Sequence, residues 1–120
     1  MTRVSDAAIG VDFGTTNTVV AFDQGGGQAG LAGFNHDGQP FNAFRSALSF
    51  HAPYDDPAGR VVEAGPWAID AYVEEPLETR FIQSFKSYAA STLFTDTEIL
   101  RRRFTFEDLL SAFLLKVREH

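Results

Sequence analysis

Residues 9–22 read IGVDFGTTNTVVAF, an apolar run interrupted by one carboxylate, one glycine and a cluster of small hydroxyl and amide side chains. The run predicts a strand over Ala7–Val11 that is buried on both faces and an antiparallel partner over Thr18–Phe22. Between them Gly14–Asn17 predicts a tight turn, which can aim backbone N–H groups and two threonine hydroxyls at one anionic point. The stretch therefore predicts a hairpin that binds phosphate.

Asp12 lies two residues before the glycine of this turn. A carboxylate at that point could hold a hydrated divalent cation beside the phosphates. An unpaired charge within a buried strand is costly, so a functional role explains Asp12 better than a surface aspartate that accepts hydrogen bonds from the turn. Gly-Thr-Thr-Asn is also favourable chemistry for an ordinary hairpin turn, so the interpretation depends on Asp12 and on the flanking apolar strands.

Length and composition indicate one domain or a piece of one, because the chain has 120 residues, 44% of them hydrophobic, with twelve Phe. The net charge of −6 argues against a nucleic-acid partner. The sequence has no Cys, which excludes disulfides and thiolate metal sites. No stretch has transmembrane length and the first six residues lack the apolar core of a signal peptide, so we expect a cytoplasmic protein without a membrane partner.

The middle of the chain reads as further strands. Gly25–Gly27 predicts a reversal, after which 28–34 forms a third strand that closes a meander. Residues 46–51 and 60–64 form a hairpin around the turn-rich segment 53–59.

The second half predicts a short helix over Trp67–Val73, which begins after Gly65-Pro66 and ends before Pro76. Phe81–Tyr88 alternates imperfectly and is expected to be extended or a single turn. Glu98–Phe104 is expected to be a strand with an exposed arginine face.

The last segment is expected to be a helix. Thr105 and Asp108 form a pair typical of a capping box, and apolar residues recur at helical spacing from Phe106 to Val117. Lys116 and Arg118 suit the C-terminal end of the helix dipole.

The hairpin motif resembles the first phosphate motif of the actin-like ATPase superfamily, and Asp12–Asn17 is most similar to the DnaK-type heat-shock chaperones. Phe50–Gly65 resembles the next hairpin of that family, and Gly65–Ala68 resembles the short helix that follows it. Phe85–Tyr88 lies where the family carries its active-site lysine. Residues 80–88 and 106–110 are most similar to the YegD-like branch, whose members have the ATPase module but lack the usual peptide-binding domain.

The resemblance implies an α/β fold of the ribonuclease-H-like, actin-like ATPase type, with a mixed sheet, an N-terminal β-hairpin meander and flanking helices. Residues 1–120 would then be the N-terminal lobe of a nucleotide-binding domain. The second phosphate loop and the adenosine-binding segment of the family come later than this stretch, so we expect a fragment of a larger protein.

The resemblance also implies the site. Gly14, Thr15, Thr16 and Asn17 would wrap the β- and γ-phosphates of ATP. Asp12 would act with them by orienting the water shell of Mg²⁺. Lys86 would lie beside the γ-phosphate and help to place the attacking water; without the resemblance it reads as a lysine that extends to solvent.

The parent protein would accordingly be a chaperone ATPase that binds ATP and ADP and acts on protein clients with co-chaperones. The fragment alone is expected to bind nucleotide weakly or not at all and to lack activity. Sheet edges or apolar surface left uncovered would make self-association unsurprising.

Two other functions stay open. A carbohydrate kinase of the same superfamily has a similar opening motif, although the segment around Lys86 argues against it. A non-catalytic interaction module could keep the fold without turnover. His36, His51 and His120 lack the spacing of metal ligands, so zinc is not expected, and Glu74-Glu75 reads as a pair of solvated acids at a helix end.

Overall fold

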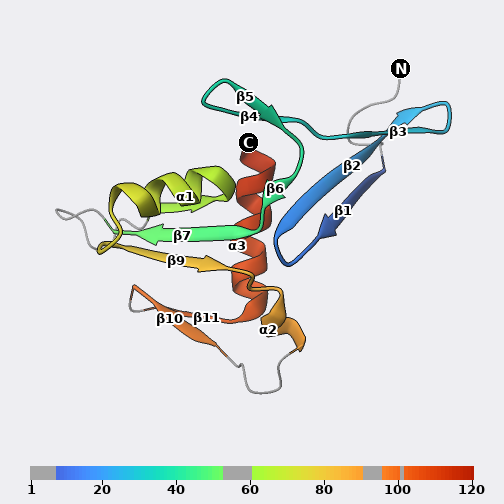
Figure 1. The fold of residues 1–120 in the computed structure, drawn as a ribbon. Helices are drawn as coiled ribbons and strands as arrows, with labels where there is room; N and C mark the ends of the chain where they lie inside the picture. The colour runs from blue at the N-terminus through green and yellow to red at the C-terminus, as the bar shows by residue number, and fades with distance from the viewer. Residues whose placement is uncertain (1–7, 53–60, 91–95, 101) are drawn as a thin grey trace.

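The computed structural model describes residues 8–52, 61–90, 96–100 and 102–120. This part of the chain is mixed α/β, with several antiparallel sheets and three helices (Figure 1). The α/β class is therefore confirmed. The expectation of a mixed sheet is wrong for the described strands, because every pair among them is antiparallel and the pairs belong to four separate sheets. Tight turns join antiparallel neighbours, whereas a parallel pair needs a long crossover.

The N-terminal meander is present as predicted. β1 (Ile9–Phe13) pairs with β2 (Asn17–Gly25) in a register from Ile9↔Phe22 to Phe13↔Thr18. β3 (Gln28–Leu31) pairs with the far end of β2, and β6 (Phe44–Arg45) pairs with its beginning. The third strand ends at Leu31, three residues earlier than predicted.

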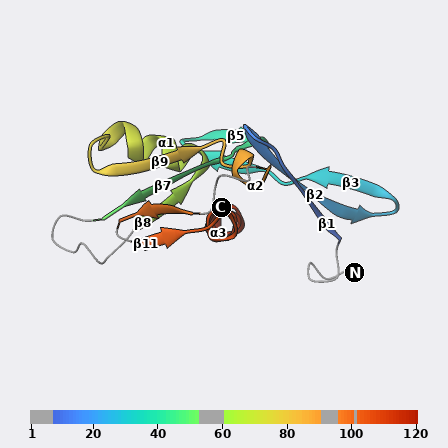
Figure 2. The ribbon, with the colours of Figure 1, turned by 90° about the horizontal axis from the view of Figure 1, so that it is seen from below.

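The prediction that the first strand is buried on both faces is wrong for its described residues. Ile9 is 61% exposed and Val11 is 49% exposed. The sheet β1–β3 projects from the rest of the molecule, as Figure 2 shows from below. The radius of gyration is accordingly 16.0 Å, whereas a compact domain of this length has about 14 Å. An apolar sequence pattern cannot reveal that a hairpin extends beyond the core.

A second sheet forms the centre of the molecule in the order β8-β7-β9, with β7 (Ala47–His51) between β8 (Val61–Ala64) and β9 (Thr79–Gln83). The predicted hairpin of 46–51 with 60–64 is thus confirmed; its turn lies outside the described residues. Residues 81–88 were expected to be either extended or a single turn, and they contain both. The segment is extended to the end of β9 at Gln83 and then enters the short helix α2 (Ser87–Ala90).

Two longer helices cover opposite faces of this central sheet. α1 (Gly65–Glu74) packs on one face, where Tyr72 stacks on Phe81 at 4.9 Å between ring centroids. α3 (Phe106–Glu119) lies on the other, beside the hairpin of β10 (Thr97–Ile99) and β11 (Arg102–Phe104). None of these helices combines the length and apolarity that crossing a membrane requires.

Both predicted helices are confirmed by their local chemistry. α1 has Pro66 in its first turn and ends before Pro76. It begins at Gly65, where φ is +60° and an added Cβ would lie 2.6 Å from the Phe44 ring, so no other residue fits without rearrangement. At the start of α3, the Thr105 side chain accepts from the Asp108 N–H at 3.2 Å, and Asp108 accepts from the Thr105 N–H at 3.0 Å.

The single strand predicted over 98–104 is instead the hairpin β10–β11. Ile99 pairs with Arg102, and the chain reverses at Leu100, which has φ of +51°. No glycine marks this reversal, so the sequence gives no turn signal there.

A small hairpin of β4 (Phe34–His36) and β5 (Gln39–Phe41) connects the projecting sheet to the body. Its turn falls at Asp37-Gly38, where both residues have positive φ.

Candidate functional site

The loop at the end of the β1–β2 hairpin depends on glycine. The Gly14 N–H donates to the Asn17 carbonyl at 2.9 Å and so closes the turn. A Cβ built on Gly14 would lie 2.5 Å from that same carbonyl oxygen. The turn therefore cannot keep its geometry with a larger residue at position 14.

Ser46 holds one side of this loop. Its hydroxyl donates to the Gly14 carbonyl at 2.9 Å, and its N–H donates to the Thr16 carbonyl at 2.8 Å. The Thr18 hydroxyl completes the set by hydrogen bonding to the Ser46 hydroxyl at 2.8 Å. Ser46 and Thr18 are both buried, so the carbonyl groups of the loop are fixed to the body of the protein.

The other side of the loop faces solvent. Thr15 and Thr16 are exposed, and in the part of the chain that the structure describes their N–H groups and hydroxyls have no hydrogen-bond partner. Asn17 is also exposed, at the first position of β2. The carbonyl groups of the loop are thus held by the body of the protein, while its N–H and hydroxyl donors face solvent. This arrangement favours binding of an anion.

Asp12 is exposed and lies on the face of β1 opposite to Phe13. Its strand partner is Val19, so Asn17 lies on the same face as a diagonal neighbour. The argument that Asp12 is a costly charge in a buried strand is therefore wrong. An exposed carboxylate can still bind a hydrated cation, because such ions keep several of their water ligands.

Lys86 lies in the turn that precedes α2 and is exposed. The residue before it, Phe85, is fully buried with its ring 5.2 Å from the ring of Phe13. Figures 1 and 2 both show α2 beside the loop end of the β1–β2 hairpin. The fold therefore brings the Lys86 segment to the hairpin. Among the described residues, no hydrogen bond or ion pair joins Lys86 to Asp12 or to the loop.

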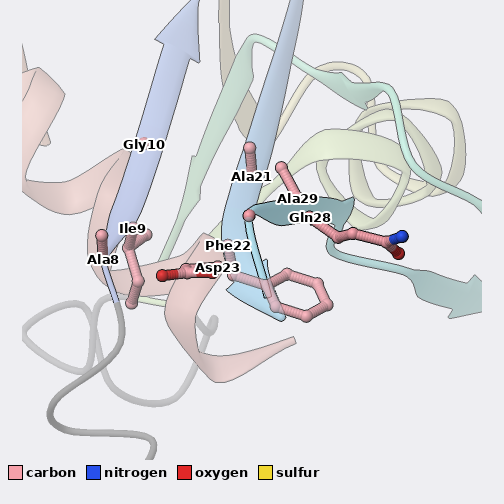
Figure 3. Close-up of a pocket in the computed structure, with 9 residues that line it drawn as sticks. Ala8, Ile9, Gly10, Ala21, Phe22, Asp23, Gln28 and Ala29 are labelled. Carbon is pink, nitrogen blue, oxygen red and sulfur yellow. The ribbon is translucent and has the colours of Figure 1, made fainter. Parts of the chain in front are cut away.

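A pocket of about 500 Å³ lies on the same hairpin, at the end away from the loop (Figure 3). Ile9, Ala21 and Phe22 are among the residues that line it. It contains one carboxylate, Asp23, which already accepts from the Gly25 N–H at 2.8 Å. Its lining is too apolar, and too far along the strands from Gly14, for this pocket to be part of a phosphate site.

A cluster that the sequence analysis missed joins the β4–β5 hairpin to α1. His36 Nε2 lies 2.6 Å from Asp70 Oδ2 and 3.8 Å from Asp37 Oδ2, and these ligand atoms all lie within 4.8 Å of one another. Asp70 is distant in sequence, so residue spacing could not reveal the group. Both carboxylates are well exposed, and the short His36–Asp70 hydrogen bond accounts for the arrangement by itself.

Comparison of the chain with protein-family models, with curated proteins and with solved structures found no match.

Proposed function

We propose that this chain is the phosphate-binding lobe of a DnaK-type, actin-like ATPase, and that the Gly14–Asn17 loop binds the phosphates of Mg-ATP. The observation that carries the proposal is the two-sided construction of the loop. Ser46 fixes its carbonyl groups, while the N–H groups and hydroxyls of Thr15 and Thr16 are turned to solvent without protein partners in the described residues. Hydrogen bonds from such donors to oxyanions are stronger than bonds between neutral groups.

Asp12 and Lys86 take complementary roles in this proposal. Asp12, on the same face as Asn17, would hold Mg²⁺ through water, and the ion would supply positive charge beside the phosphates. Lys86, on a segment fixed to the hairpin by the Phe13–Phe85 contact, would neutralise charge on the γ-phosphate. Phosphoryl transfer depends mainly on this kind of positioning and electrostatic stabilisation.

The isolated chain should bind nucleotide only at millimolar concentrations. One exposed loop supplies few donors, and none of the described residues covers the nucleotide from the opposite side. Binding must also overcome the loss of translational and rotational freedom of the ligand.

Amide NMR of the 120-residue chain tests the proposal directly. Titration with Mg-ATP or magnesium pyrophosphate should shift the Thr15, Thr16 and Asn17 resonances, whereas AMP, which lacks the β- and γ-phosphates, should leave them unchanged. The double variant Thr15→Ala/Thr16→Ala removes two hydroxyl donors and should weaken the response. Thr97→Ala, on β10 away from the loop, is the matched control.

Two results would contradict the proposal. One is an absence of loop shifts at millimolar Mg-ATP; the other is an equal response to AMP, which would indicate that the β- and γ-phosphates are not what is bound. If the loop binds phosphate, ATP hydrolysis by a longer protein that contains this lobe, with and without Lys86→Ala, separates an ATPase from a binding module without turnover.

A further inference from the structure

One flank of α1 is apolar and exposed. The helix rests on the central sheet with Gly65 and Ala68 buried. Ile69, Tyr72 and Val73 follow at the spacing of one helical stripe, i, i+3 and i+4, and all three are exposed, Val73 by 73%. A helix that covers a sheet usually turns polar side chains to solvent. Packing within the described part of the chain therefore does not explain this stripe.

The turn between α1 and β9 extends the apolar surface. Leu77, in this turn, is 97% exposed. The turn is held by a hydrogen bond from the Glu78 N–H to the Glu75 carbonyl at 3.2 Å, and Tyr72 is held by its stacking on Phe81. We refer to Ile69, Tyr72, Val73 and Leu77 as the apolar flank. Single exposed apolar side chains are ordinary, whereas several gathered on one element indicate a site of interaction.

Negative charge accompanies the apolar flank. Four exposed carboxylates alternate with its residues along the chain, those of Asp70, Glu74, Glu75 and Glu78. Asp70 is paired with His36, whereas the other three form no ion pair with a described residue. Residues 61–79 contain no Lys or Arg. The next cation along the chain, Arg80, lies on the face of β9 opposite to Phe81, so it does not offset this charge.

The charge of the apolar flank selects its partner. A protein that covers the flank brings the carboxylates into an interface, where an unpaired charge is costly and opposite charges give specificity. The partner must therefore carry Lys or Arg beside an apolar stripe. A second copy of this chain does not meet that requirement, because a two-fold interface brings the same acidic side chains against each other. An anionic membrane surface is repelled for the same reason.

We propose that the apolar flank of α1 docks a basic amphipathic helix of another protein. Side chains spaced i, i+3 and i+4 form ridges against which those of a second helix pack. Apolar residues of the partner contact the flank, while its Lys and Arg side chains reach Glu74 and Glu78. α1 lies on the side of the molecule away from the β1–β3 sheet (Figure 1), so this docking does not depend on nucleotide binding by the Gly14–Asn17 loop.

Titration of the chain with a short amphipathic peptide of leucine and lysine, followed by amide NMR, tests the proposal. Resonances of residues 69–78 should shift, and those of the Gly14–Asn17 loop should not. A peptide of the same composition in scrambled order keeps the charge but has no apolar stripe. A peptide with glutamate in place of lysine keeps the stripe and reverses the charge. Neither should reproduce the shifts, and added salt should weaken binding of the first peptide.

Variants at exposed positions locate the docking surface without disturbing the core. The double variant Val73→Ser/Leu77→Ser removes two apolar contacts and should weaken binding by about tenfold or more. The double variant Glu74→Gln/Glu78→Gln removes two charges; it should weaken binding less and should reduce the dependence of binding on salt.

The matched controls are Leu115→Ser, an exposed leucine on α3, and Glu98→Gln, an exposed glutamate on β10; both should bind the peptide normally. Equal binding of the scrambled or the glutamate peptide would overturn the proposal, as would an unchanged affinity in Val73→Ser/Leu77→Ser. An equal response to a leucine–lysine peptide with a central proline, which interrupts a helix, would also overturn it, because the helical form of the partner would then not be what is recognised.

Discussion

At the scale of single residues, Ser46 makes the connection between the hairpin loop and the body. It satisfies two loop carbonyl groups, one through its hydroxyl and one through its N–H, and it also contacts Thr18. Its hydroxyl is buried together with that of Thr18, whereas Gly14 is half-buried. The shape of the loop is therefore determined by a residue thirty-two positions away from Gly14.

Ser46→Ala should destabilise the chain by about 1–3 kcal/mol, because it leaves the Thr18 hydroxyl and the Gly14 carbonyl without their buried partner. Urea unfolding measures the loss, and Ser111→Ala on the exposed side of α3 is the control. The double variant Ser46→Ala/Thr18→Val should cost less than the sum of the two single changes, since both partners are then apolar. Full additivity would contradict the proposed coupling.

Gly14→Ala should also destabilise the hairpin, since its Cβ would lie 2.5 Å from the Asn17 carbonyl oxygen. We expect a loss of about 1–3 kcal/mol, typical of local backbone strain. Gly10→Ala, in β1 of the same hairpin, has no atom within 4 Å of its added Cβ and should be neutral or slightly stabilising. Equal stabilities of the two variants in urea would show that the loop can rearrange at no cost.

At the scale of elements, the capping box of α3 is the clearest local device. Thr105 and Asp108 exchange hydrogen bonds across the first turn, and the apolar face of the helix continues into the core through Leu109, Phe113 and Val117. Thr105→Ala should cost about 1 kcal/mol. Thr105→Asn, which can also cap, should retain most of that stability in thermal unfolding; an equal loss in both variants would exclude capping as the cause.

The same capping box makes stability depend on pH. The N–H of Thr105 lowers the pKa of Asp108 in the folded state, and the Thr105 side chain and Arg102 add smaller effects that oppose the cost of desolvation. The stabilisation is therefore complete above the unfolded pKa of about 3.9 and is lost as pH falls through the lower, folded value. In this acidic range, the free energy of unfolding of Asp108→Asn should fall less steeply with decreasing pH than that of the unmodified chain.

Acid unfolding of these two chains and of Glu98→Gln measures the effect. Glu119, whose pKa is lowered by its hydrogen bond and ion pair with Lys116, contributes with the same sign in all three. If Asp108→Asn and the unmodified chain lost stability equally as the pH falls, the assignment of the effect to Asp108 would be contradicted.

Elements whose signals are local could be predicted from the sequence. The Gly14 turn, the helix after Pro66 and the capping box of α3 each depend on residues within a few positions of one another. The division of residues 97–104 into two strands could not be predicted, because its turn has no glycine.

For the candidate site too, features set by neighbouring residues could be predicted and features set by distant residues could not. The sequence motif predicts the loop residues, whereas the role of Ser46 and the His36–Asp70 contact depend on tertiary packing. Glu74-Glu75 alone reads as an ordinary solvated helix end, and only the exposure of the apolar residues beside this pair indicates a docking surface. Exposure of β1 was missed because apolar residues predict a strand without saying whether another layer covers it.

At the scale of the whole molecule, an aromatic cluster around Phe113 joins the projecting hairpin to the body. The Phe113 ring lies 5.7 Å from Phe13, 5.6 Å from Phe44 and 5.7 Å from Phe85. These rings come from β1, β6, the turn before α2, and α3. One side chain of α3 thus touches both the loop-bearing hairpin and the segment that carries Lys86.

Phe113→Ala should destabilise the chain by about 3–5 kcal/mol, because it opens a cavity in a fully buried cluster. Leu115→Ala, two positions along the same helix but 58% exposed, should change stability by less than about 0.5 kcal/mol. Phe113→Leu fills part of the cavity and should lie between them in urea unfolding. Because the cluster positions the hairpin relative to Lys86, amide resonances of Thr15, Thr16 and Lys86 should shift together in Phe113→Leu under conditions where it remains folded. Shifts confined to α3 would show that the hairpin and the Lys86 segment are positioned by other contacts.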